Sequence, residues 1–485
     1  MEKKERNILL SIKNAVKLVT VEPYLFFCLL GYTVRLVSFQ DLLMLQACRN
    51  VYGQPDSVCT ELKKHKALNA QCIEVGNNMY TGVMLLSSLP AVVVAIFLGP
   101  WSDKYSRKYP MIFSASGMFL EALCTAILAV FPSVPPIWFV VPSIFAGISG
   151  GFIISVSASY SYASDVTNER TRSARFAVIE FFNIAAIVVG NLIGGQVIKR
   201  GHLPVMIISP ISFACGLLYV ILILKETRPP IPAGHRLQMF RDLLRVDNIK
   251  ESYRACSKKR PGNIRCQIWM LVWIACMQRY TDLGTVSIGF PFTKQMYTWD
   301  VTDFSNASMV FYIVNAIVTI VFIPILSNKL RLHEAALGFV GMLSLISKMF
   351  VTSVAYREFM FYFAWISGTL ANATGVGVRS RISKLVRKEE IGRAFSLLGT
   401  CESITPLLGS TVFLQIFNLS SGFFPGLAFA VNGVLLIPCL IMFGWMMGMP
   451  SVSLADYERD EDEKKARPLE TISSSTYSKL EEEKC

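Results

Sequence analysis

Long apolar stretches alternate with short polar segments along most of the chain. A helix needs about 20 apolar residues to cross roughly 30 Å of hydrocarbon, so each stretch predicts a membrane-spanning helix. Six spans are predicted in the first half, at residues 24–47, 78–100, 110–131, 137–162, 174–198 and 205–224. Six more are predicted in the second half, at residues 267–293, 307–326, 335–354, 358–378, 393–417 and 424–448. The pattern therefore predicts an all-α membrane protein with twelve transmembrane helices.

The composition supports this interpretation and excludes several other classes of protein. Hydrophobic residues make up 53% of the 485 residues and charged residues only 17%, whereas an average soluble domain has about 25% charged residues. The mean hydropathy is +0.46. So much apolar surface excludes a soluble protein and a disordered chain. The 12 cysteines in 485 residues are too few for a secreted scaffold held together by disulfide bonds.

The net charge of +13 follows the predicted loops and does not form a nucleic-acid-binding face. With the N-terminus in the cytoplasm, the inner segments carry 36 of the 47 Lys and Arg residues and the outer loops carry eight. This asymmetry is typical of cytoplasmic loops, so we expect both termini to be cytoplasmic. The expected divisions are a cytoplasmic N-terminus (1–23), a first six-helix bundle (24–224), a cytoplasmic central loop (225–266), a second six-helix bundle (267–448) and a disordered cytoplasmic tail (449–485).

Two pairs of loops at matching places in the halves indicate an internal duplication. Residues 101–109 match residues 326–331, and residues 165–172 match residues 384–393. The segment Gly99-Pro-Trp-Ser-Asp-Lys-Tyr-Ser-Arg-Lys108 resembles the signature loop between helices two and three of the major facilitator superfamily.

That resemblance implies a gating role for the loop. Asp103, with Arg107 and Lys108, would hold a cytoplasmic gate shut across the seam between the two halves. The alternative is an ordinary basic loop at the inner membrane surface. Ser106 stands where the superfamily pattern usually has Gly.

Further motifs are similar to solute carrier family 46, the group that contains the proton-coupled folate transporter. Val21-Glu-Pro23 opens the first span, Phe176-Ala-Val-Ile-Glu180 lies in the fifth, and Arg379-Ser-Arg-Ile-Ser-Lys-Leu-Val-Arg387 closes the tenth. The resemblance extends from Val21 to about Gly444. It implies a major facilitator fold with two pseudo-symmetric six-helix bundles that transport a solute by alternating access.

Ionisable residues inside the predicted spans are the main functional candidates, because a charge at mid-bilayer is costly. Glu180 matches the family glutamate assigned to proton coupling, and its alternative is a structural carboxylate paired with Arg172 or Arg175. Glu402 is a second candidate for proton coupling, with a hydrogen bond between helices as its alternative. Protons are then the coupling ion, and no cofactor is expected.

Basic residues on the predicted spans indicate an anionic substrate. Arg379 matches a family arginine tied to substrate handling, and Arg35 and Arg279 are further candidates. Asp282 shares a helix face with Arg279, which predicts either a self-neutralising pair or a pair that opens to grip substrate. Snorkelling to lipid headgroups is the alternative for Arg379 and the favoured interpretation for Arg381.

The substrate class remains open among folate-like, muropeptide-like and cyclic-dinucleotide-like anions. The chain departs from the folate carrier in three places. It has no His near Thr281, it has Gly151 where an acidic residue is expected, and it has Ser421 where a basic residue is expected. These departures favour the branch of the family associated with lysosomal export and with muropeptide-like or cyclic-dinucleotide-like substrates.

The resemblance also bears on Cys48, Cys59 and Cys72 in the first predicted outer loop. The family joins this loop by a disulfide to the loop after the seventh span, but the latter loop has no cysteine here. We therefore expect a Cys59–Cys72 disulfide, with Cys48 free at the membrane edge. No cluster of Cys and His has the spacing of a metal site, so no metal is expected.

Short motifs bear on modification and location. Asn306 and Asn418 begin N-glycosylation sequons on the predicted outer side. Leu9 and Leu10 end an acidic dileucine pattern, and Tyr477 begins a tyrosine pattern. Both patterns resemble endolysosomal sorting signals and indicate sorting adaptors as partners. The expected location is the plasma membrane or an endolysosomal membrane.

The residues and the resemblance together predict a secondary active transporter rather than an enzyme. It is expected to couple protons to the movement of a small organic anion toward the cytosol. No glycine-rich phosphate loop or nucleophile elbow appears in the sequence. The alternatives are a receptor or scaffold with the same fold, which does not transport, and an uncoupled facilitator.

Overall fold

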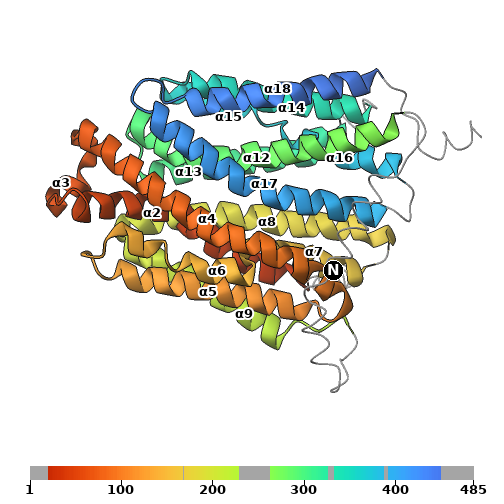
Figure 1. The fold of residues 1–485 in the computed structure, drawn as a ribbon, viewed down its shortest axis with the longest axis horizontal. Coiled ribbons are helices and arrows are strands. Elements are labelled where there is room, and N and C mark those ends of the chain that lie inside the picture. The colour runs from red at the N-terminus through yellow and green to blue at the C-terminus, as the bar shows by residue number, and fades with distance from the viewer. Residues whose placement is uncertain (1–19, 168, 229–262, 326–332, 387–390, 449–485) are drawn as a thin grey trace, which may run out of the picture.

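The computed structural model describes residues 20–167, 169–228, 263–325, 333–386 and 391–448. Within these ranges the chain folds into helices and contains no strand. Figure 1 shows two groups of long helices packed side by side, the first half of the chain below and the second half above.

The described part of the first half contains eight α-helices. They are α2 (Glu22–Asn50), α3 (Asp56–Thr60), α4 (Lys66–Lys104), α5 (Lys108–Ala129), α6 (Ser143–Ser149), α7 (Gly151–Asp165), α8 (Glu169–Val197) and α9 (His202–Leu222). Short 3-10 turns follow α3, precede α6 and follow α8, at Leu62–Lys64 (η1), Pro136–Phe139 (η2) and Ile198–Arg200 (η3). Helix α2 packs against α8 and α9 and lies at the centre of this half.

The described part of the second half contains seven α-helices. They are α12 (Ile264–Tyr297), α13 (Val301–Pro324), α14 (Glu334–Ser353), α15 (Glu358–Ser367), α16 (Asn372–Leu385), α17 (Ile391–Ser420) and α18 (Leu427–Met447). Helix α12 packs against α17, and α14 packs against α16 and α18. The halves meet where α8 contacts α13 and where α4 contacts α17.

Each predicted span coincides with one helix or with a pair of consecutive helices. Among the described residues, nine helical segments are long and apolar enough to cross a membrane. Three further predicted spans correspond to α12, to α15 with α16, and to α17, which contain the expected functional residues Arg279, Arg379 and Glu402. The structure therefore has the helices of a multi-pass membrane protein, while the count of twelve spans stays a prediction.

Two predicted spans are broken, and each break helps to place a candidate residue. The span predicted at 137–162 divides into α6 and α7 at Gly150 and Gly151, whose φ angles are +78° and +42°. Glycine adopts positive φ without the steric cost that other residues meet, so the helix changes direction here. The span predicted at 358–378 divides between α15 and α16. Tyr160 lies on α7 and Arg379 lies on α16, each after the break.

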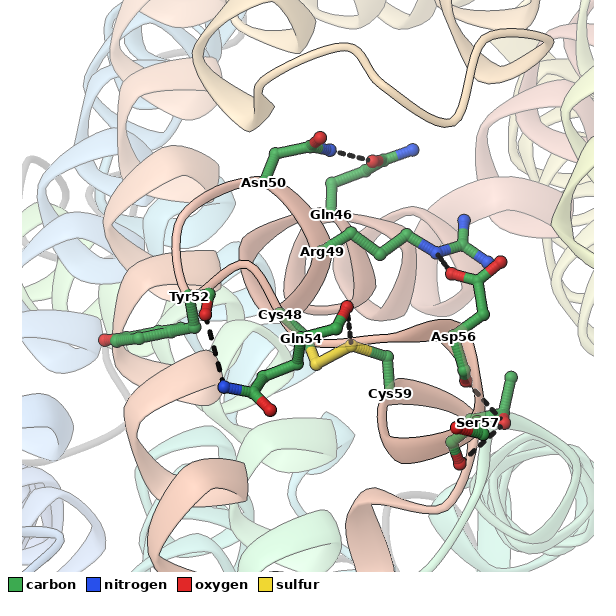
Figure 2. Close-up of a disulfide and its surroundings, with 10 residues drawn as sticks. Gln46, Cys48, Arg49, Asn50, Tyr52, Gln54, Asp56, Ser57 and Cys59 are labelled. Atoms are coloured by element: carbon green, nitrogen blue, oxygen red, sulfur yellow. Dashed lines mark hydrogen bonds and ion pairs between the residues drawn. A yellow bond between two sulfur atoms is a disulfide. The ribbon is translucent and has the colours of Figure 1, made fainter.

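The disulfide joins Cys48 to Cys59, so the predicted Cys59–Cys72 bond is wrong. Cys48 lies near the end of α2, and the chain turns back so that α3 brings Cys59 within 5.8 Å of it between Cα atoms (Figure 2). Arg49 and Asp56 form an ion pair of 2.7 Å across the same turn. Cys72 is a free, buried thiol on α4 that packs in the same small cluster. We call this part of the molecule, at the left of Figure 1, the disulfide end.

Candidate functional site

Arg379 and Glu402, which were expected to serve substrate binding and proton coupling, form an ion pair. The Nη2 group of Arg379 lies 3.2 Å and 3.1 Å from the two carboxylate oxygens of Glu402. The Arg379 side chain is 42% exposed, whereas that of Glu402 is 16% exposed. The guanidinium of Arg379 therefore stays partly accessible, and α17 supplies its counter-ion. This contact gives Arg379 a partner within the protein, and snorkelling to lipid headgroups stays its untested alternative.

Glu180 accepts hydrogen bonds from two neighbours in the first half. The Tyr160 hydroxyl on α7 donates to Oε2 of Glu180 at 2.9 Å, and the Asn183 amide donates to the same oxygen at 3.3 Å. Glu180 is exposed. Arg175, one partner considered from sequence, instead forms a buried ion pair of 2.9 Å with Glu22 at the start of α2. Arg172, the other partner considered, has a side chain outside the described set.

The polar groups of the two halves lie within electrostatic range of one another. Tyr160 belongs to the first half, and the charges of Arg379 and Arg279 in the second half act on its phenol. Arg279 is exposed, as Glu180 is. We refer to Tyr160, Glu180, Arg279, Arg379 and Glu402 as the central cluster. It combines acidic and basic side chains from both halves, as a site between two bundles requires.

Arg279 and Asp282 do not form the predicted ion pair among the described contacts. Asp282 interacts over a longer distance with Arg279 and with Lys348. Lys348 lies on α14, and its ammonium stands 4.8 Å from the centre of the Phe311 ring. Spacing along a helix brings two residues to one face but does not fix their rotamers, which here follow neighbours on other helices.

Arg35, a further candidate for substrate binding, belongs to a buried ion pair in the first half. Its Nη2 group lies 2.8 Å from Glu121 on α5, and both side chains are only 8% exposed. Its guanidinium also lies over the Phe39 ring, 5.8 Å from the ring centre. The described contacts therefore assign Arg35 to packing between α2 and α5 and not to the central cluster.

The signature loop is held by acidic residues of its own half. Arg107 donates to Asp165 at 2.8 Å, and the Lys108 ammonium donates to the Ile221 carbonyl at 2.9 Å. Glu226 binds the Ser106 hydroxyl and accepts from the backbone amide of Arg107 at 3.0 Å. Thus the described partners of this loop lie in the first half.

These bonds set the charge state of Glu226. Partial burial opposes its ionisation, but hydrogen bonds from the Ser106 hydroxyl and from the backbone amides of Arg107 and Lys108 outweigh burial and hold the Glu226 pKa below its usual range. The side chain of Asp103 lies outside the described set, so its gating role stays a prediction.

Arg381 is buried, so the favoured prediction that it snorkels to lipid headgroups is wrong. Its side chain is 2% exposed and donates to Gln267 at 2.9 Å and 3.3 Å. Glu334 lies 3.9 Å away. Arg379 and Arg381 therefore differ in kind: the first is accessible and paired on one side, whereas the second is a structural residue.

Polar contacts between the halves gather at the disulfide end. They join Gln40 to Ser287, Asp41 to Lys294, Gly195 to Thr302, Gln196 to Asn306, Asn77 to Asn418, and Asn78 to Gln415 and Asn418. We call this set the disulfide-end seam. A Cβ atom at Gly195 would meet the Ser305 side chain at 2.8 Å, so glycine permits the close approach of α8 and α13.

The seam also contains both predicted glycosylation sites, Asn306 and Asn418. Their side-chain amides bond to the opposite half in this conformation. Glycosylation there stays a prediction. The sorting motifs at Leu9, Leu10 and Tyr477 lie outside the described residues. Among the residues described, no group of three or more His, Cys, Asp or Glu side chains is arranged to hold a metal ion.

Comparison with known proteins identifies the fold. The family model described as Major Facilitator Superfamily matches residues 72–278. The chain has the fold of the major facilitator superfamily. Its fold is similar to that of a D-xylose-proton symporter, with a TM-score of 0.61 over 88% of this chain and 97% of that chain at 16% identity.

Its curated relatives include members of solute carrier family 46. A protein of Drosophila melanogaster named "Probable peptidoglycan muropeptide transporter SLC46" is 23% identical over 90% of this chain and 87% of its own length. The human "Lysosomal proton-coupled steroid conjugate and bile acid symporter SLC46A3" is 22% identical over 88% of this chain and 94% of its own length. The resemblance found in the motifs therefore extends over most of this chain.

Sequence reasoning missed several residues that bind a partly buried carboxylate or join the two halves. Lys294 and His202 both contact Asp41, and Gln415 contacts Asn78. The one available signal was Asp41 itself, since a carboxylate in an apolar span requires a partner. Amide pairs such as Asn78 and Gln415 carry no sequence signal, because their meaning depends on two helices that are distant in the chain.

Proposed function

We propose that this protein is a proton-coupled symporter that moves an organic anion toward the cytosol. The observation that supports this proposal most directly is the pair of Arg379 with Glu402, within range of Tyr160 and its partner Glu180. The names of two relatives point the same way, since one concerns muropeptides and the other a proton-coupled symporter of steroid conjugates and bile acids.

Exchange of partners at Arg379 links the anion to the proton. A substrate carboxylate, sulfate or phosphate competes with Glu402 for the guanidinium, which binds such groups through parallel hydrogen bonds. Glu402 then loses its cation in a poorly hydrated place, where a bare carboxylate is costly. Uptake of a proton by Glu402 removes that cost. Binding of the anion and binding of the proton therefore favour each other.

Glu180 provides a second carboxylate on the opposite half. In its ionised form it accepts from Tyr160 and Asn183, so hydrogen bonds hold its charge among the described contacts. Tyr160 in turn feels the charges of Arg379 and Arg279. A proton on Glu180 changes the field at the arginines, which connects coupling in the first half to substrate binding in the second.

The closed disulfide-end seam corresponds to one state of alternating access. Disulfides form on the oxidising side of a membrane, so we place this end in the extracellular or lumenal space and the termini in the cytosol. The described conformation is then closed to the outside. Rocking of the halves breaks the seam and exposes the central cluster to the other compartment.

An endolysosomal membrane fits this direction of transport, because its lumen supplies protons. The human relative is named as lysosomal, and the motifs at Leu9, Leu10 and Tyr477 resemble sorting signals that adaptors bind. The plasma membrane is the alternative location. Immunolocalisation of the full chain and of a variant with Leu9 and Leu10 changed to alanine decides between them.

The function is tested with purified protein in liposomes. A panel of radiolabelled anions and matched neutral esters is offered with the outer solution at about pH 5.5 or about pH 7.4. We expect uptake of an anion that is faster at acidic outer pH and is accompanied by proton entry. Absence of flux for the whole panel supports the receptor or scaffold alternative, and flux without proton entry supports the uncoupled facilitator.

A further inference from the structure

Asp41 is bound by one side chain from each half of the molecule. Its Oδ1 atom pairs with the ammonium of Lys294 on α12, and its Oδ2 atom lies 2.9 Å from Nε2 of His202 at the start of α9. The side chains of the three residues are between 14% and 20% exposed. The carboxylate therefore belongs to a contact across the seam and to a contact within the first half at the same time.

We propose that His202 is a second proton-binding site, separate from the central cluster, and that its protonation opens the disulfide-end seam. Histidine is the side chain that changes charge between about pH 5 and pH 8. The physiological meaning of this step rests on the proposed function, whereas the opening itself does not require a transported substrate.

The physical basis is a change in the local charge balance. With a neutral His202, the charges of Asp41 and Lys294 cancel. With a protonated His202, two cations share one carboxylate in a partly buried place, which is unfavourable. The charge-assisted bond from His202 to Asp41 lies within the first half and is unaffected when the halves separate. Movement of Lys294 away with the second half relieves the repulsion, so protonation favours the open seam.

Four other charged groups lie near His202, two on its own half and two on the facing helix. On η3, directly before α9, Arg200 is exposed and Lys199 donates to Gln196 at 2.9 Å. Both cations lie in the first half and move with His202, so they do not change the difference between the closed and the open seam. On the facing α13, the carboxylates of Asp300 and Asp303 are engaged with each other's backbone amides in a capping box.

The rest of the seam is neutral in the described contacts. Amide and hydroxyl groups form its other bonds, including Asn77 with Asn418, Asn78 with Gln415, and Thr302 with the Gly195 carbonyl. These groups do not change charge in the physiological range of pH. The seam is therefore sensitive to a low pH at one place, the contact of Asp41 with Lys294 and His202. A low pH outside would open the face from which the protons come.

Opening is measured as the distance between spin labels on the two halves. One label is attached at Ser133→Cys, in the loop after α5, and the other at Gly422→Cys, in the loop after α17. Both positions are exposed. A Cβ atom at Gly422 meets nothing within 4 Å. The labels are attached in a chain in which Cys124, Cys215, Cys256, Cys266, Cys401 and Cys485 are serine. Pulsed electron resonance then gives the distances at about pH 7.4 and about pH 5.5, without substrate.

We expect the ratio of long to short distances to rise roughly tenfold at acidic pH in the parent chain, which corresponds to about 1.4 kcal/mol. His202→Gln should keep the short distance at both pH values, and His202→Arg should show the long distance at both. His65→Gln, at an exposed histidine before α4, is the matched control and should respond like the parent. Asp41→Asn gives a second test: it removes the carboxylate and should be open at both pH values.

The proposal is overturned if the parent distances do not change with pH, or if His202→Gln responds as the parent does. A closed Asp41→Asn variant at neutral pH also contradicts it. Failure of the proposed transport function is a separate result. The liposome panel then shows no proton-coupled flux while the distances still depend on pH through His202.

Discussion

Arg379 and Glu402 bind each other through one guanidinium nitrogen, at 3.1 Å and 3.2 Å from the two carboxylate oxygens. The two residues come from α16 and α17, and each had a separate expected role. The proposed exchange of partners joins those roles in one mechanism, in which a substrate anion competes with Glu402 for the guanidinium. The predictions below follow from this contact and from three others.

The first prediction concerns the anion site. Arg379→Ala should weaken the apparent affinity for substrate about tenfold to a hundredfold, because a lost charge-assisted hydrogen bond costs roughly 1.5–3 kcal/mol. Arg379→Lys should recover only part of the affinity, since lysine lacks the planar fork. Concentration dependence of uptake in liposomes measures both. Equal uptake of the anion and its neutral ester would remove the anion-binding role.

Arg381→Ala provides the contrast within the same helix. Arg381 is buried and bonded to Gln267, so its loss leaves polar groups without partners and should lower thermal stability and the amount of folded protein. Size-exclusion chromatography and thermal unfolding in detergent measure this loss. Arg379→Ala should change stability much less. If the two variants lost affinity to the same extent at full stability, the distinction between them would be wrong.

The second prediction concerns the exchange of partners. Glu402→Gln removes the competing charge, so Arg379 should bind substrate as tightly at neutral pH as the parent protein does at acidic pH. Binding of a labelled anion at several pH values measures the effect. Glu74→Gln, at an exposed position on α4, is the control and should behave like the parent. A pH-dependent affinity that survives in Glu402→Gln would assign the proton to another group.

The third prediction concerns Glu180. Glu180→Gln keeps an oxygen that accepts from Tyr160 but cannot exchange a proton, so transport should lose most of its pH dependence. Initial uptake rates between about pH 5 and pH 8 test this. Net flux driven by a proton gradient should fall more than exchange of substrate at equal concentrations on both sides. Equal losses in the two assays would point to a structural role.

The fourth prediction uses the lowered pKa of Glu226. Because this pKa is below its usual range, the bonds to the carboxylate stabilise the protein above about pH 4.3, the ordinary value for glutamate, and this contribution is lost as pH falls through the lowered pKa. Ser106→Ala should therefore lower the melting temperature at about pH 7 and have less effect well below about pH 4, where the carboxyl is protonated in the folded protein too. Ser133→Ala, at an exposed loop, is the control. A larger effect of Ser106→Ala at acidic pH would contradict the lowered pKa of Glu226.

The fifth prediction concerns the disulfide. Peptide mapping without reduction should recover Cys48 linked to Cys59, and Cys72→Ser should leave that link intact. Cys48→Ser and Cys59→Ser should each abolish it. A linked pair of Cys59 and Cys72 in the parent protein would restore the bond expected from sequence.

The order of apolar and polar residues was sufficient to predict the helices of this protein. Hydrophobic length is a local property, and it identified twelve ranges that all coincide with helices. The motifs at Val21, at the signature loop and at Arg379 were sufficient to predict the superfamily, because their chemistry lies in consecutive residues. The breaks at Gly150 and before α16 were not predicted, because an apolar run has the same composition whether it forms one helix or two.

The partners of the charged residues were decided only by tertiary structure. Arg35 and Arg379 look alike in sequence, yet one is buried against Glu121 and the other is half-exposed beside Glu402. Asp41 reaches Lys294, 253 residues further along the chain. An ionised side chain in an apolar setting takes whichever counter-charge the packing of helices brings near it, and no spacing within one helix encodes that choice.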